Sequence, residues 1–143
     1  MTWKNPDDAA VQEILGRVRS IVVVGLSPKP RRDSHSVTAY MQRQGYRITG
    51  VNPGHDLILG EPCYPTLSAV PTDRPLELVN FFRNSADVGR HMDEAVALGA
   101  GALWLQLDVI DEAAARRAGA LGIPVIMDRC LLVEHRRLLG RRA

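Results

Sequence analysis

A chain of 143 residues, 45% of them hydrophobic, has the size of one domain with one packed core, so a two-domain enzyme is not expected. Its 18 Lys and Arg residues against 16 Asp and Glu residues leave a formal charge of +2, too small an excess for sequence-blind binding to nucleic acid. The longest purely apolar run, residues 21–24, is far below the roughly 20 residues that span a bilayer, and the first residues lack the apolar region of a signal peptide. We therefore expect a cytoplasmic protein that binds neither nucleic acid nor membranes.

The first half of the chain is expected to run helix, strand, loop, helix, strand. In chain order these are a helix at 7–17, a strand at 20–26, a helix that carries Val37, Tyr40 and Met41 and ends before Gly45, and a strand at 46–51. The strand at 20–26 is nearly all β-branched, as a central strand buried on both faces should be. Two prolines exclude a helix from the following loop, Gly25 to Asp33, and the turn Asn52-Pro53-Gly54 ends the second strand.

The second half alternates strands and helices after a stretch rich in Pro, Gly and Thr. In that stretch, residues 57–75, we expect only a short strand at 57–59 and a turn of helix near 67–70. After it we expect a strand at 76–82 and then a helix capped by Asn84 or Ser85. The apolar face of that helix is formed by Val88, Met92, Ala95, Val96 and Leu98. The remaining elements are a strand at 102–105, a helix at 111–120, a strand at 124–127 and a helix at 131–139.

This alternation predicts an α/β protein: a single Rossmann-like, doubly wound domain with about five mainly parallel strands and helices on both faces. We expect the domain at 20–139, after a helical lead-in at 1–19 and before a basic tail at 140–143. Such sheets bind ligands beyond the carboxyl ends of their strands, where the strand order reverses. The segments expected at that edge are Gly25 to Arg32, Val51 to His55, Phe82 to Ser85, Gln106 to Val109 and Asp128 to Cys130.

The loop after the first strand concentrates positive charge at the expected start of a helix. It holds the hydroxyl of Ser27 and the cations Lys29, Arg31 and Arg32. A helix amino terminus favours anions, so three clustered cations make electrostatic sense if a multiply charged anion sits between them. The alternative is a solvated loop with long basic side chains.

Two common nucleotide-binding patterns are missing. The loop has one glycine and two prolines where the dinucleotide fingerprint needs three glycines, and the second strand ends in Val51-Asn52-Pro53 without the acidic residue that holds the ribose of NAD. The P-loop pattern is also absent. NAD and nucleotide triphosphates are therefore disfavoured as ligands.

Seven short motifs occur in the order and at the strand ends typical of one family. They are Val24 to Arg31 with Ser34 and Val37, Gly45-Tyr46, Val51-Asn52-Pro53, Leu59-Gly60, Phe81-Phe82-Arg83, Trp104-Leu105-Gln106, and Met127 to Cys130 with Glu134. From about residue 21 to 139 the chain resembles the small bacterial CoA-binding proteins. More distantly, it resembles the N-terminal CoA-binding domain of the succinyl-CoA synthetase alpha subunit.

The resemblance implies a Rossmann-type fold that holds coenzyme A, with its nucleotide half and diphosphate near the first two loops. It implies that Gly25 and Ser27 approach and hydrogen-bond the phosphates, with Lys29, Arg31 and Arg32 as counter-charges. Val51, Asn52 and Pro53 are expected to border the adenine, and Phe82 and Arg83 to face the middle of the cofactor. The other expected cofactor-binding residues are Pro28, Gln106, Arg129 and Cys130. At the expected pantetheine end the chain departs from the synthetase domain. It has Asp128-Arg129-Cys130-Leu131 where that domain has an Asn-Cys-Pro-Gly turn.

The synthetase carries its phosphohistidine in a second domain and its nucleotide site in a beta subunit. The leading hypothesis is therefore a protein that binds CoA or acyl-CoA without autonomous catalysis. Three alternatives stay open: a CoA-dependent acyl transferase or ligase component that needs a partner chain, a thiol-dependent activity through Cys130, and an NAD-binding Rossmann regulator. A protein partner or a homo-oligomer is also left open.

The remaining reactive residues do not assemble into a recognisable site. The histidines (His35, His55, His91 and His135) are scattered, so surface or cap roles are expected for each. Cys63 and Cys130 lack the close spacing of metal ligands, and neither a zinc site nor a disulfide framework is expected. Cys130, at the expected start of the last helix, is a candidate for a mixed disulfide with CoA, although a free buried cysteine is the commoner outcome.

Overall fold

The computed structural model describes residues 3–140, so most of the basic tail expected at 140–143 lies outside the described residues. The strands are β1 (Ser20–Val24), β2 (Arg47–Val51), β3 (Leu57–Ile58), β4 (Glu61–Tyr64), β5 (Leu78–Phe81), β6 (Leu103–Leu105) and β7 (Val125–Ile126). The helices are α1 (Asp8–Arg17), α2 (Asp33–Arg43), α3 (Ser85–Ala97), α4 (Glu112–Ala120) and α5 (Leu131–Leu139), with a short 3-10 helix, η1, at Leu67–Ala69. All five expected helices and all five main strands are confirmed.

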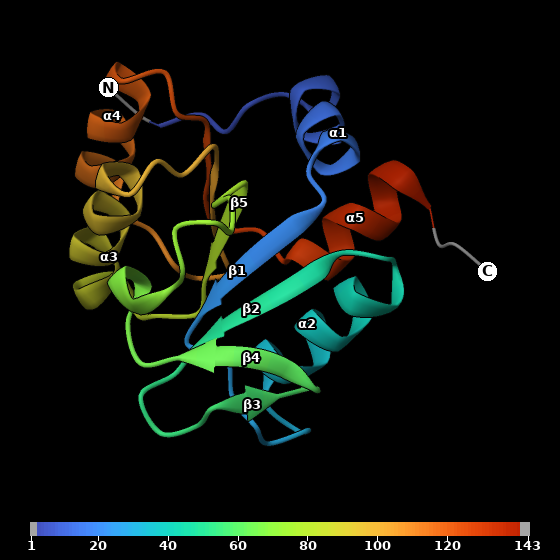
Figure 1. Ribbon diagram of the computed structural model, residues 1–143. Coiled ribbons are helices and arrows are strands. Elements are labelled where there is room, and N and C mark those ends of the chain that lie inside the picture. Colours follow the sequence, from blue (N-terminus) through green and yellow to red (C-terminus); the bar gives the residue numbers. More distant parts are fainter. Residues whose placement is uncertain (1–2, 141–143) are drawn as a thin grey trace.

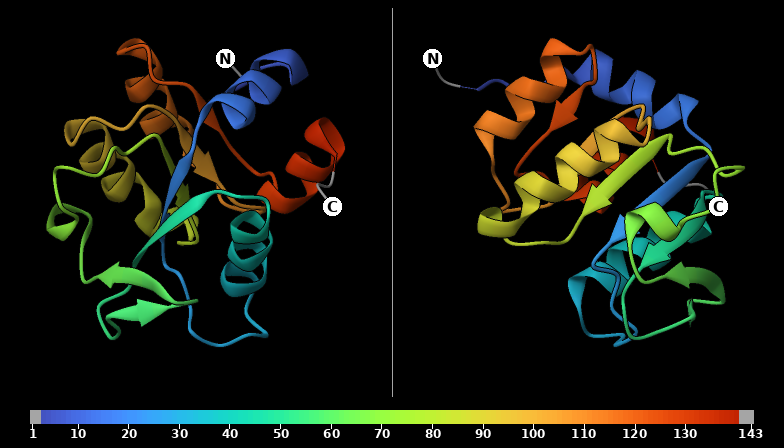
Figure 2. Two further views of the ribbon diagram at one scale, coloured as in Figure 1. Left: turned by 45° about the vertical axis from the view of Figure 1, so that its right-hand side comes forward. Right: turned by 60° about the vertical axis from the view of Figure 1, so that its left-hand side comes forward.

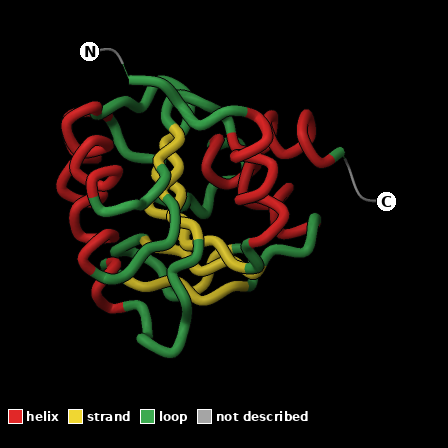
Figure 3. Tube along the Cα trace, turned by 90° about the horizontal axis from the view of Figure 1, so that it is seen from above, coloured by secondary structure: helices red, strands yellow, loops and turns green. Residues whose placement is uncertain are grey.

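The strands form one sheet in the order β3-β4-β2-β1-β5-β6-β7, in which only the β3–β4 pair is antiparallel (Figure 1). Helices α1, α2 and α5 pack on one face, around a core that includes Leu15, Tyr40 and Trp104. Helices α3 and α4 pack with η1 on the other face, around Phe81 and Met92. Seen from above, the strands lie between these two groups of helices (Figure 3). The predicted α/β, doubly wound domain with helices on both faces is confirmed.

Strand β1 occupies the centre of the sheet, as its β-branched sequence predicts. It pairs with β2 on one side and β5 on the other, and Val24 lies level with both Val51 and Phe81. The loops that follow these three strands therefore leave the sheet side by side. The chain passes from β1 to α2 on one face and from β5 to α3 on the other, so the strand order reverses between β1 and β5 (Figure 2). A ligand site is expected at this point.

The sheet has two more strands than the five expected, because β3 and β4 form a hairpin in the Pro- and Gly-rich stretch. Leu59 and Gly60 connect them with φ values of +57° and +72°, the backbone of a two-residue hairpin turn. Leucine rarely adopts positive φ, and Pro62 within β4 argues against a strand. Strand β4 nevertheless forms because it pairs in parallel with β2, a contact between distant segments that local patterns do not reveal.

Candidate ligand-binding site

The site begins at Gly25, where β1 ends and the chain crosses the end of β5. Gly25 has a φ of +88°, and a Cβ at this position would lie 2.7 Å from the carbonyl oxygen of Phe82. Its own N–H donates to the Val51 carbonyl at 3.0 Å. Glycine is required here both for the backbone conformation and for this close approach, which brings the loops after β1, β2 and β5 together.

The loop from Gly25 to Arg32 is braced by hydrogen bonds to its own serine and to the start of α2. The Ser27 N–H donates to Ser34 Oγ at 2.9 Å, and the Lys29 N–H donates to Ser27 Oγ at 3.1 Å. Arg32 is the N-cap residue of α2, and its side chain makes no capping hydrogen bond. The loop is thus shaped by its own contacts, with the amino end of α2 beside it.

Three cations of this loop are exposed and have no internal partner. Within residues 3–140, Lys29, Arg31 and Arg32 take part in none of the ion pairs, whereas Arg83, Arg117 and Arg137 each pair with a carboxylate. The loop borders a cavity of about 480 Å³, which we call the cationic cavity; it is lined by Gly25, Ser27, Lys29, Arg31, Arg32, Asp33, Ser34 and Phe82. Its charge suits a ligand with more than one phosphate.

A second cavity, of about 670 Å³, adjoins the first and shares Gly25, Ser27 and Phe82 with it. We call it the mixed cavity; its other lining residues are Val24, Val51, Asn52, Pro53, Pro65, Thr66, Leu67, Arg83, Arg90, His91 and Glu94. The two cavities together bring ten of the predicted site residues to one place: Gly25, Ser27, Lys29, Arg31, Arg32, Val51, Asn52, Pro53, Phe82 and Arg83. Pro28 lies in the same loop, between Ser27 and Lys29.

Asn52 shapes the wall of the mixed cavity with a side chain that is already bonded at both ends. Its Nδ2 donates to the Leu26 carbonyl at 2.9 Å, and its Oδ1 accepts from the Gly54 N–H at 2.8 Å. The amide therefore holds the turn after β2 against the loop after β1. Val51 and Pro53 on either side of it present apolar surface to the cavity.

Sequence reasoning missed the part of the mixed cavity that does not come from strand ends. Pro65, Thr66 and Leu67 follow β4, a strand that was not expected, and Arg90, His91 and Glu94 lie further along α3. The only available signal was helical spacing, which places residues 90, 91 and 94 on one side of a helix. Such a signal does not show which side faces a ligand.

His91, a titratable residue among these, is partly buried. Its Nε2 is shut off from solvent and has no hydrogen-bond partner among the described residues. Burial, and then the nearby Arg83 and Arg90, lower the pKa of His91. The neutral imidazole is favoured as a result.

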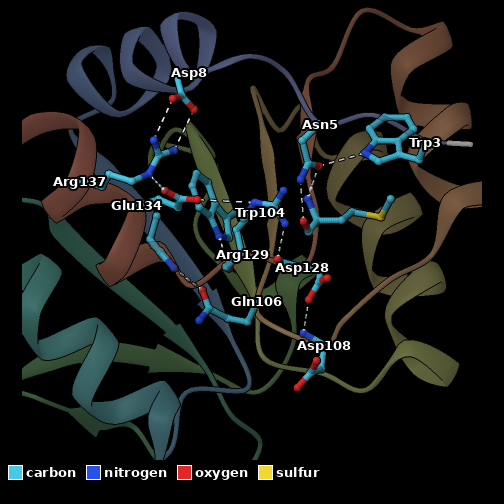
Figure 4. Close-up of polar contacts among 12 residues, drawn as sticks. Trp3, Asn5, Asp8, Trp104, Gln106, Asp108, Asp128, Arg129, Glu134 and Arg137 are labelled. Atoms are coloured by element: carbon cyan, nitrogen blue, oxygen red, sulfur yellow. Dashed lines mark hydrogen bonds and ion pairs between the residues drawn. The ribbon is translucent and has the colours of Figure 1, made fainter.

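Gln106, Arg129 and Cys130 line neither cavity. Gln106 is only 6% exposed, and its Oε1 accepts from Asn80 Nδ2 at 3.2 Å and from the Leu131 N–H at 3.1 Å. Arg129 is half-exposed and pairs with Glu134 at 3.6 Å (Figure 4). Cys130 is the N-cap residue of α5 and is partly buried against the core. These three residues organise the start of α5 instead of joining the other predicted residues.

Both cysteines are free thiols, and burial is the main cause of a raised pKa at Cys63. Among the residues that the structure describes, no group of three or more His, Cys, Asp or Glu side chains is placed to hold a metal ion. No helix within residues 3–140 is long and apolar enough to cross a membrane.

A separate cavity of about 420 Å³ lies at the opposite end of the sheet, with Arg17, Arg74 and Glu77 in its wall. It is bordered by the segments that lead into β1 and β5, at the amino ends of the strands. Open α/β sheets bind ligands at the carboxyl ends of their strands, so the cationic and mixed cavities are the better candidates.

The chain is similar to known proteins over nearly its whole length. It is 39% identical over 132 residues to the uncharacterized protein YneT of Bacillus subtilis (strain 168), an alignment that covers 92% of this chain and 96% of YneT. It superimposes with a TM-score of 0.90 on the crystal structure of Prb, a PH1109 protein redesigned for binding, at 35% identity and with 99% and 98% of the two chains covered.

One larger enzyme shares the fold. A dinucleotide-forming acetyl-coenzyme A synthetase from Ca. Korarchaeum cryptofilum matches with a TM-score of 0.63 at 23% identity, over 75% of this chain and 25% of the synthetase chain. The model of the CoA binding domain matches residues 19–136, which include every strand of the sheet and both cavities' loops. The chain therefore belongs to the CoA-binding domain family.

Proposed function

We propose that this protein binds coenzyme A or acyl-CoA as a carrier or sensor, without turning it over by itself. The observation that carries the proposal is the braced loop after β1, whose three cations have no partner within the described residues and face a cavity at the strand-order reversal. In a chain of the CoA-binding domain family, a ligand with several phosphates is the natural counter-ion for them.

The two cavities differ in charge, and this difference supports an orientation for the ligand. The cationic cavity carries three cations against Asp33. In the mixed cavity Arg83 and Arg90 are offset by Asp87, at 3.6 and 4.0 Å, and by Glu94 in the wall. We place the phosphates in the cationic cavity and the adenine in the mixed cavity, against Val51 and Pro53.

The competing functions are supported less well by the geometry. NAD is disfavoured because β2 is followed by Asn52, whose amide bonds the Leu26 carbonyl and the Gly54 N–H, and not by a carboxylate that would hold a ribose. A thiol-dependent reaction through Cys130 is disfavoured because Cys130 lines neither cavity. A ligase or transferase component would need a partner chain to supply the chemistry.

Calorimetry with the purified chain tests the proposal. We expect measurable binding of CoA, weaker binding of dephospho-CoA because one charge-assisted contact to the 3′-phosphate is lost, and weaker binding of NADH than of CoA. Absence of binding at millimolar CoA contradicts the proposal. Incubation with acyl-CoA, followed by a free-thiol assay, tests for turnover; release of CoA that disappears in Cys130→Ser would show an enzyme instead.

A further inference from the structure

His91 lies in the wall of the mixed cavity with a polar atom that the protein itself leaves unpaired. It sits in the second turn of α3, and its Nε2 is buried without a partner among residues 3–140. A buried nitrogen without a hydrogen bond is costly, and a partner supplied by a ligand or a water is one of the explanations for such an atom in a native structure. The sequence led us to expect an ordinary surface or cap role for His91, which is partly buried in the structure.

The charged groups around His91 come from one side only. Arg83 precedes α3, and Asp87, Arg90 and Glu94 lie on it; all four act on the imidazole through their charges. The segment that faces α3 across the cavity contributes Pro65, Thr66 and Leu67, and the strand ends contribute Val24 and Val51, none of which titrates. The two guanidinium groups lower the pKa of His91 and the two carboxylates raise it, so their effects oppose each other. Burial, the largest cause, lowers this pKa and favours the neutral imidazole.

The other uncharged polar side chains of the mixed cavity each make at least one hydrogen bond within the protein. Asn52 is bonded at both ends of its amide, Ser27 Oγ accepts from the Lys29 N–H, and Thr66 Oγ1 accepts from the Ala69 N–H. His91 Nε2, in contrast, has no hydrogen-bond partner among the described residues, and the same wall includes the apolar surfaces of Pro53 and Pro65. A flat, uncharged heteroaromatic ring matches this combination better than a phosphate does.

We propose that His91 is a specificity-determining residue for the base, whose neutral imidazole hydrogen-bonds the edge of the adenine ring and so couples CoA binding to a proton. The inference rests on the proposed function, because it assigns a residue to the base within the same site. A base packed against His91 buries it further and disfavours its protonated form. The pKa of His91 is therefore lower in the complex than in the free protein.

The sign of the pH dependence follows from this linkage. Binding favours neutral His91, so CoA affinity is highest above the pKa of His91 in the free protein and falls as the pH falls through it. A phosphate beside His91 has the opposite effect, because it stabilises the imidazolium, raises the pKa and strengthens binding in acid. The direction of the change thus distinguishes a base from a phosphate in the mixed cavity.

The test compares the wild-type protein with His91→Gln, which keeps a polar group but does not titrate. Calorimetry between about pH 5.5 and 8 gives the Kd of CoA for both proteins. The ratio of the two values is the readout, because the 3′-phosphate of CoA itself titrates near pH 6 and its contribution cancels. We expect the ratio of wild-type to variant Kd to rise as the pH falls, by up to about tenfold per pH unit below the pKa of His91.

Two ligand fragments assign the effect to the base. Adenosine 3′,5′-bisphosphate should reproduce the pH-dependent ratio, and 4′-phosphopantetheine, which lacks the base, should give a flat ratio. A histidine titration by NMR on the wild-type protein provides the same information without a variant. His91 should titrate at lower pH with CoA bound than in the free protein.

Each other outcome overturns the inference. A ratio that falls in acid, or a pKa of His91 that rises on binding, places a phosphate beside it. A flat ratio with CoA shows that His91 does not contact the ligand, while CoA binding itself leaves the proposed function intact. If neither protein binds CoA at any pH, the proposed function fails and the inference fails with it.

Discussion

Two corners of the sheet's carboxyl edge carry similar residues and use them in opposite ways. At one corner the loop after β1 brings Lys29, Arg31 and Arg32 to the start of α2, with no ion-pair partner in the described part of the chain. At the other corner β6 and β7 meet the start of α5, where Arg129 pairs with Glu134. Arg137, in the last turn of the same helix, pairs with Glu134 and with Asp8. The charge of Arg129 is thus compensated at the start of α5, whereas the cations beside the start of α2 have no ion-pair partner among the described residues.

The second corner is held together by its own polar network (Figure 4). Arg137 bonds Glu134 at 2.6 Å and both carboxylate oxygens of Asp8 at 2.8 Å, which ties α5 to α1. Asn5 bonds both the N–H and the carbonyl of Met127 at 2.8 Å, so the segment before α1 covers the open edge beside β7. This corner therefore stabilises the fold, whereas the first corner is ordered but electrostatically incomplete.

The largest effect is expected from Gly25→Ala, which changes the residue where β1 ends and the cationic loop begins. Because the new Cβ meets the Phe82 carbonyl at 2.7 Å and the φ is +88°, we expect unfolding free energy to fall by about 3 kcal/mol or more and CoA binding to be lost. Denaturant unfolding and calorimetry measure both. Gly45→Ala is the matched control: φ is +100° but nothing lies within 4 Å, so it should cost only about 1–2 kcal/mol and leave CoA affinity unchanged. Equal losses in the two variants would show that the close approach to Phe82 is unimportant.

Arg31→Ala tests whether the unpaired cations serve a ligand. We expect CoA affinity to fall by about 1.5–3 kcal/mol, the range of a charge-assisted hydrogen bond, with little change in the denaturation midpoint. Arg137→Gln should do the reverse, lowering the midpoint and leaving CoA affinity as it is, because its charge is used between α1 and α5. If Arg137→Gln weakens CoA binding as much as Arg31→Ala does, the assignment of Arg31 to the ligand and of Arg137 to the fold is wrong.

Gln106→Leu tests the structural role of Gln106, which the sequence analysis predicted to bind the cofactor. The substitution leaves the Leu131 N–H without its acceptor, so we expect a loss of about 1–2 kcal/mol in unfolding free energy. Gln12→Leu removes an exposed hydrogen bond to the Leu138 carbonyl and should cost much less. If Gln106→Leu instead keeps its stability and loses CoA affinity, Gln106 contacts the ligand.

The smallest effect concerns Asp8, which is fully exposed and screened by solvent. The hydrogen bond from Arg137 lowers the pKa of Asp8, so its contribution to stability is present above the unfolded pKa and is lost as the pH falls through the folded one. Thermal unfolding should show Asp8→Asn less stable than wild type near neutral pH, with the difference shrinking in acid and at high salt. A difference that persists at pH values below both pKa values would contradict the ion-pair explanation.

Much of the architecture was predictable because it depends on local patterns. The β-branched run of β1 led to a central strand, and the apolar spacing along α3 led to a helix face on which Val88, Met92 and Ala95 are buried. Val96 on that face is only partly buried, and Leu98, which was expected on it, is the C-cap residue and is 43% exposed. The short strand expected at 57–59 is present as β3, but its hairpin partner β4 was missed because Leu59 adopts a positive φ and Pro62 lies within a strand. The hairpin that contains Leu59 and Pro62 is stabilised because β4 pairs with β2. That contact joins distant segments of the chain, so the residues near Leu59 and Pro62 do not reveal it.

The candidate site was predictable at strand ends and unpredictable elsewhere. Gly25, Asn52 and Phe82 follow parallel neighbouring strands, so their common position follows from the sheet alone. His91 and Thr66 reach the mixed cavity from a helix flank and from the loop after β4. Which flank of a helix faces a cavity depends on how the helix packs, and this information is not in its periodicity.

By itself, the sequence determined the order of the main elements, the strand-end location of the site and the membership of a CoA-binding family, because these depend on neighbouring residues and short motifs. Only the tertiary structure decided which basic residues are compensated. The pair between Arg137 and Asp8 joins residues 129 positions apart, whereas Arg31 meets no carboxylate among the described residues although Asp33 is its near neighbour in sequence. Charge compensation is a property of distances in space, and the chain order alone does not contain them.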